Sequence, residues 1–181
     1  MKNKNIFEHF WDCITTNYAT FNGRARRKEY WSFVLVNFLV GIVIGTFDFI
    51  LTDLAMNHSS IISLGMLTTL GLFIPNLAVS IRRFHDTNKN GAIPLVFSLF
   101  SLVYYILFFL VSSRQIDTRL LENMDWDLML PVSIVLGLTL FGFAIYLLII
   151  YFTDGTKGPN KYGLSPKYPN PETELEQIGT E

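Results

Sequence analysis

The sequence has almost no cysteine. Cys13 is the only one among 181 residues, so the chain makes no internal disulfide and no cysteine cluster for zinc or an iron–sulfur group. Motifs of common enzymes are also missing, since there is no G-x-S-x-G, P-loop, H-E-x-x-H or G-x-G-x-x-G. The sequence therefore indicates no catalytic, cofactor-binding or metal-binding residue, and a non-enzymatic role is favoured.

Charged residues are scarce as well. They make up 16% of the chain, against about 25% in an average soluble domain. Apolar residues make up 50% and are clustered, which indicates membrane spans rather than a globular core. The formal net charge is -1, so overall charge identifies no partner and no nucleic acid is expected. Residues 1–30 lack a continuous apolar run, which argues against a cleaved signal peptide.

Four apolar runs stand out against this background. Each holds at least 20 residues, and a helix that rises about 1.5 Å per residue then reaches roughly 30 Å, the thickness of a bilayer core. Asp48 is the only charged residue within them. It suits either contact with headgroups near the end of the first run or a buried proton site. An all-α membrane protein is predicted, with four transmembrane helices at 31–51, 61–81, 92–111 and 128–152.

Lys and Arg are unevenly distributed between the two sides of this predicted bundle. The N-terminal arm holds six, the second connection three and the C-terminal tail three, whereas the first and third connections together hold only Arg114 and Arg119. Because positively charged loops stay in the cytoplasm, both termini and the second connection are predicted there. The expected regions are a cytoplasmic arm, a membrane bundle, a turn-rich cytoplasmic tail and a disordered acidic end, at 1–30, 31–152, 153–171 and 172–181.

The arm itself has a helical pattern. Between Ile6 and Tyr18, apolar residues recur every three or four positions and form one stripe, with polar residues on the other side. The segment is too short and too polar to span a bilayer. It is predicted to be an amphipathic helix that either lies in the membrane interface or packs on the inner face of the protein.

Three polar motifs lie at the predicted cytoplasmic ends of the runs. They are Phe21-x-Gly23-Arg24-x-Arg26-Arg27-x-Glu29-Tyr30-Trp31, Arg82-Arg83-x-His85-Asp86, and Gly158-x-Asn160-x-Tyr162-Gly163-x-x-Pro166. In their order and placement, the chain resembles the bacterial inner-membrane proteins of domain-of-unknown-function family eight-zero-five, the YhaH-like proteins, over residues 10–168. One departure is that Gly91 precedes Ala92, Ile93 and Pro94, where the family usually has two Trp. The resemblance implies a fold and an inner-membrane location, without an assigned activity.

The same motifs supply the candidate site. Arginines near the edge of a span are partly desolvated and need carboxylate partners, so Arg82 and Arg83 are expected to pair with Glu29 and Asp86. These guanidinium groups could also bind an anionic phospholipid headgroup. His85 and Asp86 point about 100° apart if they lie on a helix, which disfavours an acid/base couple or metal site. The candidates for this polar clamp or headgroup site are Arg24, Arg26, Arg27, Glu29, Arg82, Arg83, His85, Asp86, Asn160 and Tyr162.

Two classes of function remain open. The first is a non-enzymatic scaffold or a module that interacts with lipid or protein, such as a membrane-protein partner or a second copy of the chain. The second is a small transporter or channel component, which needs a polar path through the spans. A glycine pair, Gly41 and Gly45, would let another helix approach the first span closely. The side chains that could mark a polar path are Asn37, Asp48, Thr68, Thr69 and Asn76.

Overall fold

The structure is a computed structural model that describes residues 4–54, 63–112 and 126–167. Within these ranges the secondary structure is helical, and the extended backbone amounts to one isolated bridge between Asn160 and Gly163. The predicted all-α class is confirmed. Most of the first and third predicted connections, including Arg114 and Arg119, lie outside the described residues, as does the acidic end at 172–181. The helices are α1 (Ile6–Ile14), α2 (Arg27–Leu54), α3 (Leu64–Asp86), α4 (Ala92–Ser112) and α6 (Trp126–Phe152).

Three of these helices contain segments long and apolar enough to cross a membrane. These segments are Arg27–Leu51, Leu64–Asp86 and Leu130–Phe152, while α4 contributes a shorter apolar stretch, Ala92–Leu107. Helix α3 also continues through the second polar motif, which was expected to be a connection after residue 81. Its polar end can remain helical because those side chains find partners within the protein.

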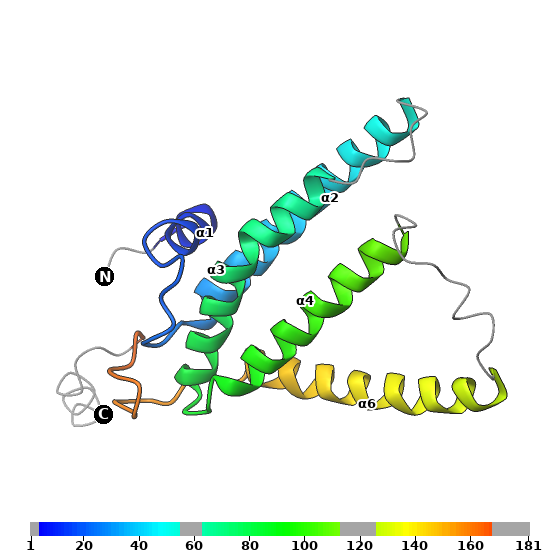
Figure 1. The fold of residues 1–181 in the computed structure, drawn as a ribbon. Helices are drawn as coiled ribbons and strands as arrows, with labels where there is room; N and C mark the ends of the chain where they lie inside the picture. Colours follow the sequence, from blue (N-terminus) through cyan, green and yellow to red (C-terminus); the bar gives the residue numbers. More distant parts are fainter. Residues whose placement is uncertain (1–3, 55–62, 113–125, 168–181) are drawn as a thin grey trace, which may run out of the picture.

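The long helices form a fan that is joined at one end (Figure 1). Helices α2 and α3 lie side by side, whereas α4 and α6 diverge from them as they leave the joined end. At the far end of the pair, the Asp48 carboxylate accepts hydrogen bonds from the backbone N–H groups of Leu64 and Gly65, at 3.1 and 2.7 Å. Asp48 thus caps the start of α3, a role distinct from the two expected for it.

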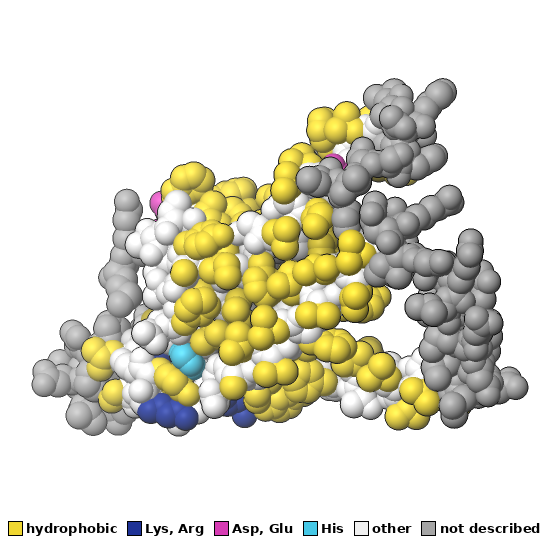
Figure 2. All heavy atoms as spheres, viewed as in Figure 1, with side chains coloured by type: hydrophobic (Ala, Val, Ile, Leu, Met, Phe, Trp, Pro, Cys, Tyr) yellow, Lys and Arg dark blue, Asp and Glu magenta, His cyan; other side chains and the backbone are white. Residues whose placement is uncertain are grey.

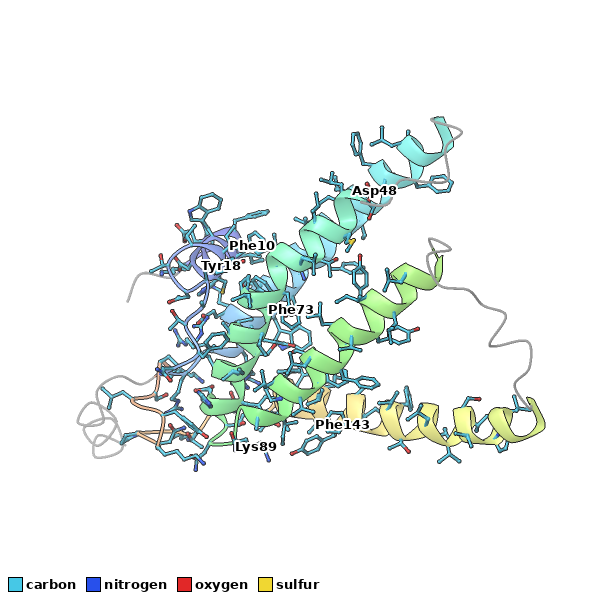
Figure 3. All side chains as sticks on the ribbon, in the orientation of Figure 1. Phe10, Tyr18, Asp48, Phe73, Lys89 and Phe143 are labelled. Atoms are coloured by element: carbon cyan, nitrogen blue, oxygen red, sulfur yellow. The ribbon has the colours of Figure 1, made fainter. Side chains whose placement is uncertain are left out.

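Helix α1 packs against the joined end of the fan. Phe10 stacks on Phe33 of α2 with ring centroids 5.4 Å apart, and Cys13 is fully buried beside it. Beyond the helix, the Tyr18 hydroxyl donates to the Gly71 carbonyl of α3 at 2.8 Å. Figure 3 shows Phe10 and Tyr18 directed toward this pair of helices. The arm is therefore docked on the protein's own surface through one side of its apolar stripe.

The buried core is concentrated at the joined end. One cluster holds Cys13, Phe33 and Val79, and a second holds Phe84 and Leu147. Away from this end, large apolar side chains cover much of the visible surface (Figure 2). An exposed apolar surface of this extent is suited to lipid contact.

Candidate functional site

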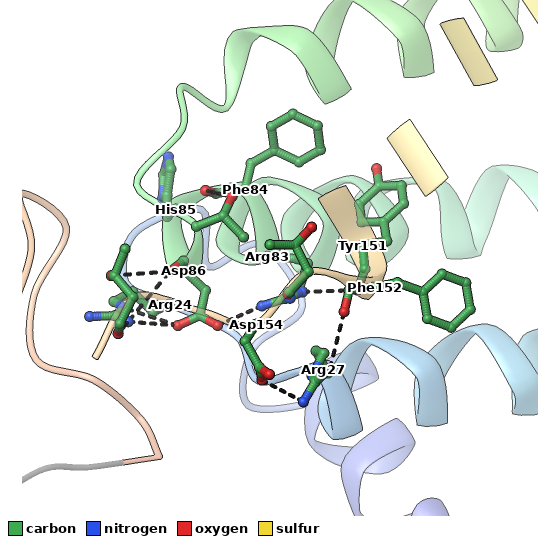
Figure 4. A network of polar contacts seen from close by, with 12 residues as sticks. Arg24, Arg27, Arg83, Phe84, His85, Asp86, Tyr151, Phe152 and Asp154 are labelled. Carbon is green, nitrogen blue, oxygen red and sulfur yellow. Dashed lines mark hydrogen bonds and ion pairs between the residues drawn. The ribbon is translucent and has the colours of Figure 1, made fainter. Parts of the chain in front are cut away.

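A buried network of charged groups connects the helices at the joined end of the fan. Its centre is Asp86, whose carboxylate accepts from Arg24 Nε at 2.9 Å and from Arg83 Nη1 at 2.5 Å (Figure 4). The side chains of Arg24, Arg83 and Asp86 are 1%, 0% and 7% exposed. Two guanidinium groups thus share one carboxylate away from solvent, an arrangement that is stable only with additional acceptors.

Backbone carbonyl groups at the end of α6 and in the tail supply those acceptors. Arg24 donates to the carbonyl oxygens of Thr156 and Gly158 at 2.6 and 2.8 Å. Arg83 donates to the carbonyl oxygens of Tyr151 and Thr153 at the end of α6. The two arginines therefore connect the end of α3 and the first polar motif to the segment that follows α6.

The tail crosses Asp86 at Gly155. A Cβ atom added at this position would collide with the Asp86 carboxylate. One residue later, the Thr156 backbone N–H donates to the Asp86 carbonyl at 2.8 Å. Glycine is thus required sterically for the tail to lie against the network.

A second ion pair connects α2 with α3 beside α1. Arg82 Nη1 lies 2.5 Å from Glu29 Oε1, with both side chains largely buried. Cys13 Sγ of α1 is 3.9 Å from Glu29 Oε1 and 4.0 Å from Arg82 Nη2. Burial, followed by the nearby Glu29 carboxylate, raises the pKa of the Cys13 thiol to about 11. The thiol is therefore protonated near neutral pH, and it serves as a packed neutral group.

His85 uses partners other than Asp86. Its Nδ1 atom is 3.1 Å from the Gly23 carbonyl oxygen, and its ring stacks on Tyr162 with centroids 3.7 Å apart. Asn160 Nδ2 donates to the His85 carbonyl oxygen at 2.9 Å. Among the described residues, no three His, Cys, Asp or Glu side chains are grouped so that they could hold a metal ion. The contacts of His85 are those of a side chain that holds the tail against the end of α3.

Arg26 and Arg27 lie beside the buried network, near Asp86 and Gly155. Arg27 forms an ion pair with Asp154 and donates to the Phe152 carbonyl at 3.1 Å. Both arginines border a cavity of about 450 Å³, here called the basic cavity. Its lining holds five Lys or Arg and two Asp. The residues that border it are Arg26, Arg27, Lys28, Asp86, Asp154, Gly155, Lys157, Ser165 and Lys167.

Sequence reasoning missed several of these positions. The lysines of the tail were counted only for orientation, and Gly155 was noted only as part of a turn-rich segment. The tail's density of Gly, Pro and Asn predicted turns, but turns do not reveal which side chains the backbone crosses. Several residues that contribute to the buried ion pairs or border the basic cavity were not among the candidates from the sequence. They are Cys13, Lys28, Asp154, Gly155, Thr156, Lys157, Ser165 and Lys167.

A second cavity, of about 580 Å³, lies between α2, α3 and α4, with the last turns of α6 at one end, and is here called the interhelical cavity. It is bordered by four of the five side chains that could mark a polar path, with Asp48 the exception. Gly41 and Gly45 border it too, and a Cβ atom added at either would meet no atom within 4 Å. The glycine pair thus faces open space, where a closely packed helix was expected. The four side chains of the possible path are Asn37, Thr68, Thr69 and Asn76.

Long apolar helices that are fastened at one end by buried ion pairs define a small integral membrane protein. The chain belongs to the family described as "Protein of unknown function (DUF805)", whose model matches residues 18–164. This confirms the resemblance expected from the three motifs.

Two relatives from Escherichia coli K12 support the same assignment. Inner membrane protein YhaI is 33% identical over 155 residues, which cover 86% of this chain and 92% of YhaI. Inner membrane protein YhaH is 40% identical over 87 residues, which cover 46% of this chain and 68% of YhaH. No solved structure matches the chain significantly. The chain is thus an integral inner-membrane protein in contact with the lipid bilayer.

Proposed function

We propose that this protein is a non-enzymatic module of the inner membrane that binds an anionic lipid headgroup in the basic cavity. In this proposal α2, α3, α4 and α6 all cross the bilayer, and both termini lie in the cytoplasm. The orientation is supported by the location of Lys and Arg, since 12 of 14 belong to the arm, the second connection and the tail.

The observation that carries the proposal is that the arginines fall into two groups with different surroundings. Arg24, Arg82 and Arg83 are buried and already bonded to carboxylates, so they act in the polar clamp that joins the helices. Arg26 and Arg27 border the basic cavity together with three lysines, and the pair that Arg27 forms with Asp154 is an exposed one. The lining holds five Lys or Arg against two Asp, so positive charge exceeds negative charge among the residues that border the cavity.

An anionic headgroup matches this charge and position. Basic side chains beside the cytoplasmic leaflet attract anionic lipids by about 1 kcal/mol per Lys or Arg. The cavity lies where α2 begins and where the tail follows α6, which is the predicted interface level of both helices. The proposal thus gives Arg26 and Arg27 a ligand-binding role and leaves the clamp residues a structural one.

Native mass spectrometry of protein released from nanodiscs tests the headgroup site. Wild-type protein should retain phosphatidylglycerol or cardiolipin in preference to phosphatidylcholine. The Arg26→Gln and Lys157→Gln proteins should lose most of that preference, while Lys89→Gln should keep it. Lys89 is a matched control because it lies at the joined end of the fan (Figure 3), over the Tyr146 ring and away from the basic cavity. Equal retention of all three lipids by the wild type would contradict the proposal.

A second candidate is a small transporter or channel component. It is favoured by one observation, namely that Asn37, Thr69 and Asn76 border the same interhelical cavity. The wall of this cavity reaches Ser80 of α3, and toward the joined end the helix continues to the buried Arg82 and Arg83. Because buried side chains follow the cavity at this end, the arrangement supports binding of a ligand within the membrane more directly than passage of a ligand through the membrane.

A further inference from the structure

The interhelical cavity combines space with hydrogen-bonding groups at the level of the spans. Its volume of about 580 Å³ falls within the roughly 300–1,000 Å³ typical of small-molecule sites. Part of this space comes from Gly41 and Gly45, whose missing side chains leave the α2 wall set back. The cavity is thus large enough for a small organic group.

Polar groups border the cavity on each of α2, α3 and α4. Asn37 belongs to α2, Asn76 to α3, and Ser98 and Tyr105 to α4. Within the described part of the chain, neither Asn37 nor Asn76 has a hydrogen-bond partner for its side-chain amide. An amide at the level of the hydrocarbon core is costly to leave unpaired, so a bound ligand would satisfy these groups.

The lining also indicates that the ligand is uncharged. Among the described residues that border the cavity there is no Asp, Glu, Lys, Arg or His. An ion would lie there in a low dielectric without a counter-charge, which is strongly unfavourable. Amides and hydroxyls can both donate and accept, so they match neutral hydroxyl or carbonyl groups.

One end of the cavity is aromatic. Tyr30 and Tyr151 border it there and stack on one another, with ring centroids 4.2 Å apart and an interplanar angle of 15°. Beyond them comes the buried clamp, through Arg83 and its contact with the Tyr151 carbonyl. The stacked rings therefore separate the uncharged cavity from the charged network.

We propose that the interhelical cavity binds an uncharged ligand through hydroxyl or carbonyl groups. The ligand has two possible sources with this chemistry: the neutral headgroup of a membrane lipid, and a small polyhydroxyl solute. The inference does not depend on the headgroup site in the basic cavity, which is separate and selects for negative charge.

Binding to full-length protein in phosphatidylcholine nanodiscs tests this proposal. Dioleoylglycerol is the lipid probe, measured by native mass spectrometry, and glycerol and glucose are the solute probes, measured by ligand-observed NMR. The proposal expects either the lipid arm or the solute arm to show saturable binding. The absence of saturable binding in both arms would overturn it.

Variants locate the binding. Gly45→Leu fills the cavity, and Asn76→Leu removes an amide while keeping the side-chain volume; each should weaken binding by at least about tenfold. Gly137→Leu on α6 is the matched control, because a Cβ atom there also meets no atom within 4 Å and Gly137 lies outside the cavity. It should bind as the wild type does.

The variants also keep the two proposals separate. Gly45→Leu should leave phosphatidylglycerol retention at the wild-type level, and an unchanged circular dichroism spectrum and melting temperature report that the variant is folded. If Gly45→Leu is not folded by these measures, Asn76→Leu provides the test with less change in volume. Unchanged dioleoylglycerol, glycerol and glucose binding in the folded variants would overturn the assignment to this cavity.

Discussion

Asp86 is the residue on which most elements of the joined end depend. Its carboxylate pairs with Arg24 and Arg83, and its carbonyl oxygen accepts from the Thr156 backbone N–H. Because both arginines are buried, the loss of this carboxylate would leave two uncompensated positive charges. A residue at the end of one helix thereby influences three separate segments of the chain.

Truncation of either partner of the Arg83–Asp86 ion pair should strongly destabilise the protein. Removing one partner of a buried ion pair typically costs about 3–5 kcal/mol, whereas an ordinary surface change stays within about 0.5 kcal/mol. Asp86→Ala and Arg83→Ala should therefore lower the melting temperature in detergent far more than Lys89→Ala does. Melting temperatures equal to that of Lys89→Ala would contradict a structural role for the clamp.

Gly155 tests the packing of the tail without removing any charge. A single added methyl group in Gly155→Ala would collide with the Asp86 carboxylate, so the tail has to shift and weaken its hydrogen bonds. A lower melting temperature and faster proteolysis of the tail are expected. Gly142→Ala serves as the control, since a Cβ atom there meets no atom within 4 Å. Equal behaviour of the two variants would rule out the tight crossing at Gly155.

At the scale of elements, long apolar runs predicted helices well because hydropathy is a property of the sequence itself. The stretch from Arg82 to Asp86 was expected to be a connection because its charges end the apolar run. Its helical state depends on partners such as Arg24 and Thr153, which are distant in sequence. The divergence of α6 was not predictable either, because that helix is apolar on all sides and its sequence indicates no preferred packing face.

Helix α1 has a second apolar edge that remains exposed. Phe7 and Trp11 are 72% and 64% exposed, although Phe10 and Cys13 on the other side are packed against the protein. This edge is expected to enter the membrane interface. In a Cys13→Ser background, a nitroxide at Phe7 should be more accessible to dissolved oxygen, and one at Thr15 to a water-soluble nickel complex. Equal accessibility of both labels to the nickel complex would contradict this placement.

At the scale of the whole molecule, the four-span arrangement predicts where each connection lies. Reporter fusions after Ser60 and Asp125 should report the periplasmic side, and fusions after Lys89 and at Glu181 should report the cytoplasm. The physical reason is the concentration of Lys and Arg on the arm, the second connection and the tail. Inversion of any one of these positions would exclude the proposed topology.

The candidate site could be only partly derived from the sequence. The residue types of the three motifs indicated buried ion pairs, but spacing could not show that Arg82 contacts Glu29 while Arg83 contacts Asp86. Nor could it show that Arg26 and Lys157 would border one cavity. Those relations depend on how the start of α2 meets the tail, which is a property of the folded molecule.

The central claim is that the buried arginines form the clamp whereas Arg26 and its neighbours bind the headgroup. The most direct test of this claim is the shift in melting temperature that phosphatidylglycerol causes in two arginine variants. Arg82→Gln should have a lower melting temperature than the wild type but keep the increase on lipid addition, because the buried Arg82 pairs with Glu29. Arg26→Gln should start near the wild type and lose most of the increase, because Arg26 borders the basic cavity. The reverse pattern, with the lipid response lost in Arg82→Gln and kept in Arg26→Gln, would contradict the account.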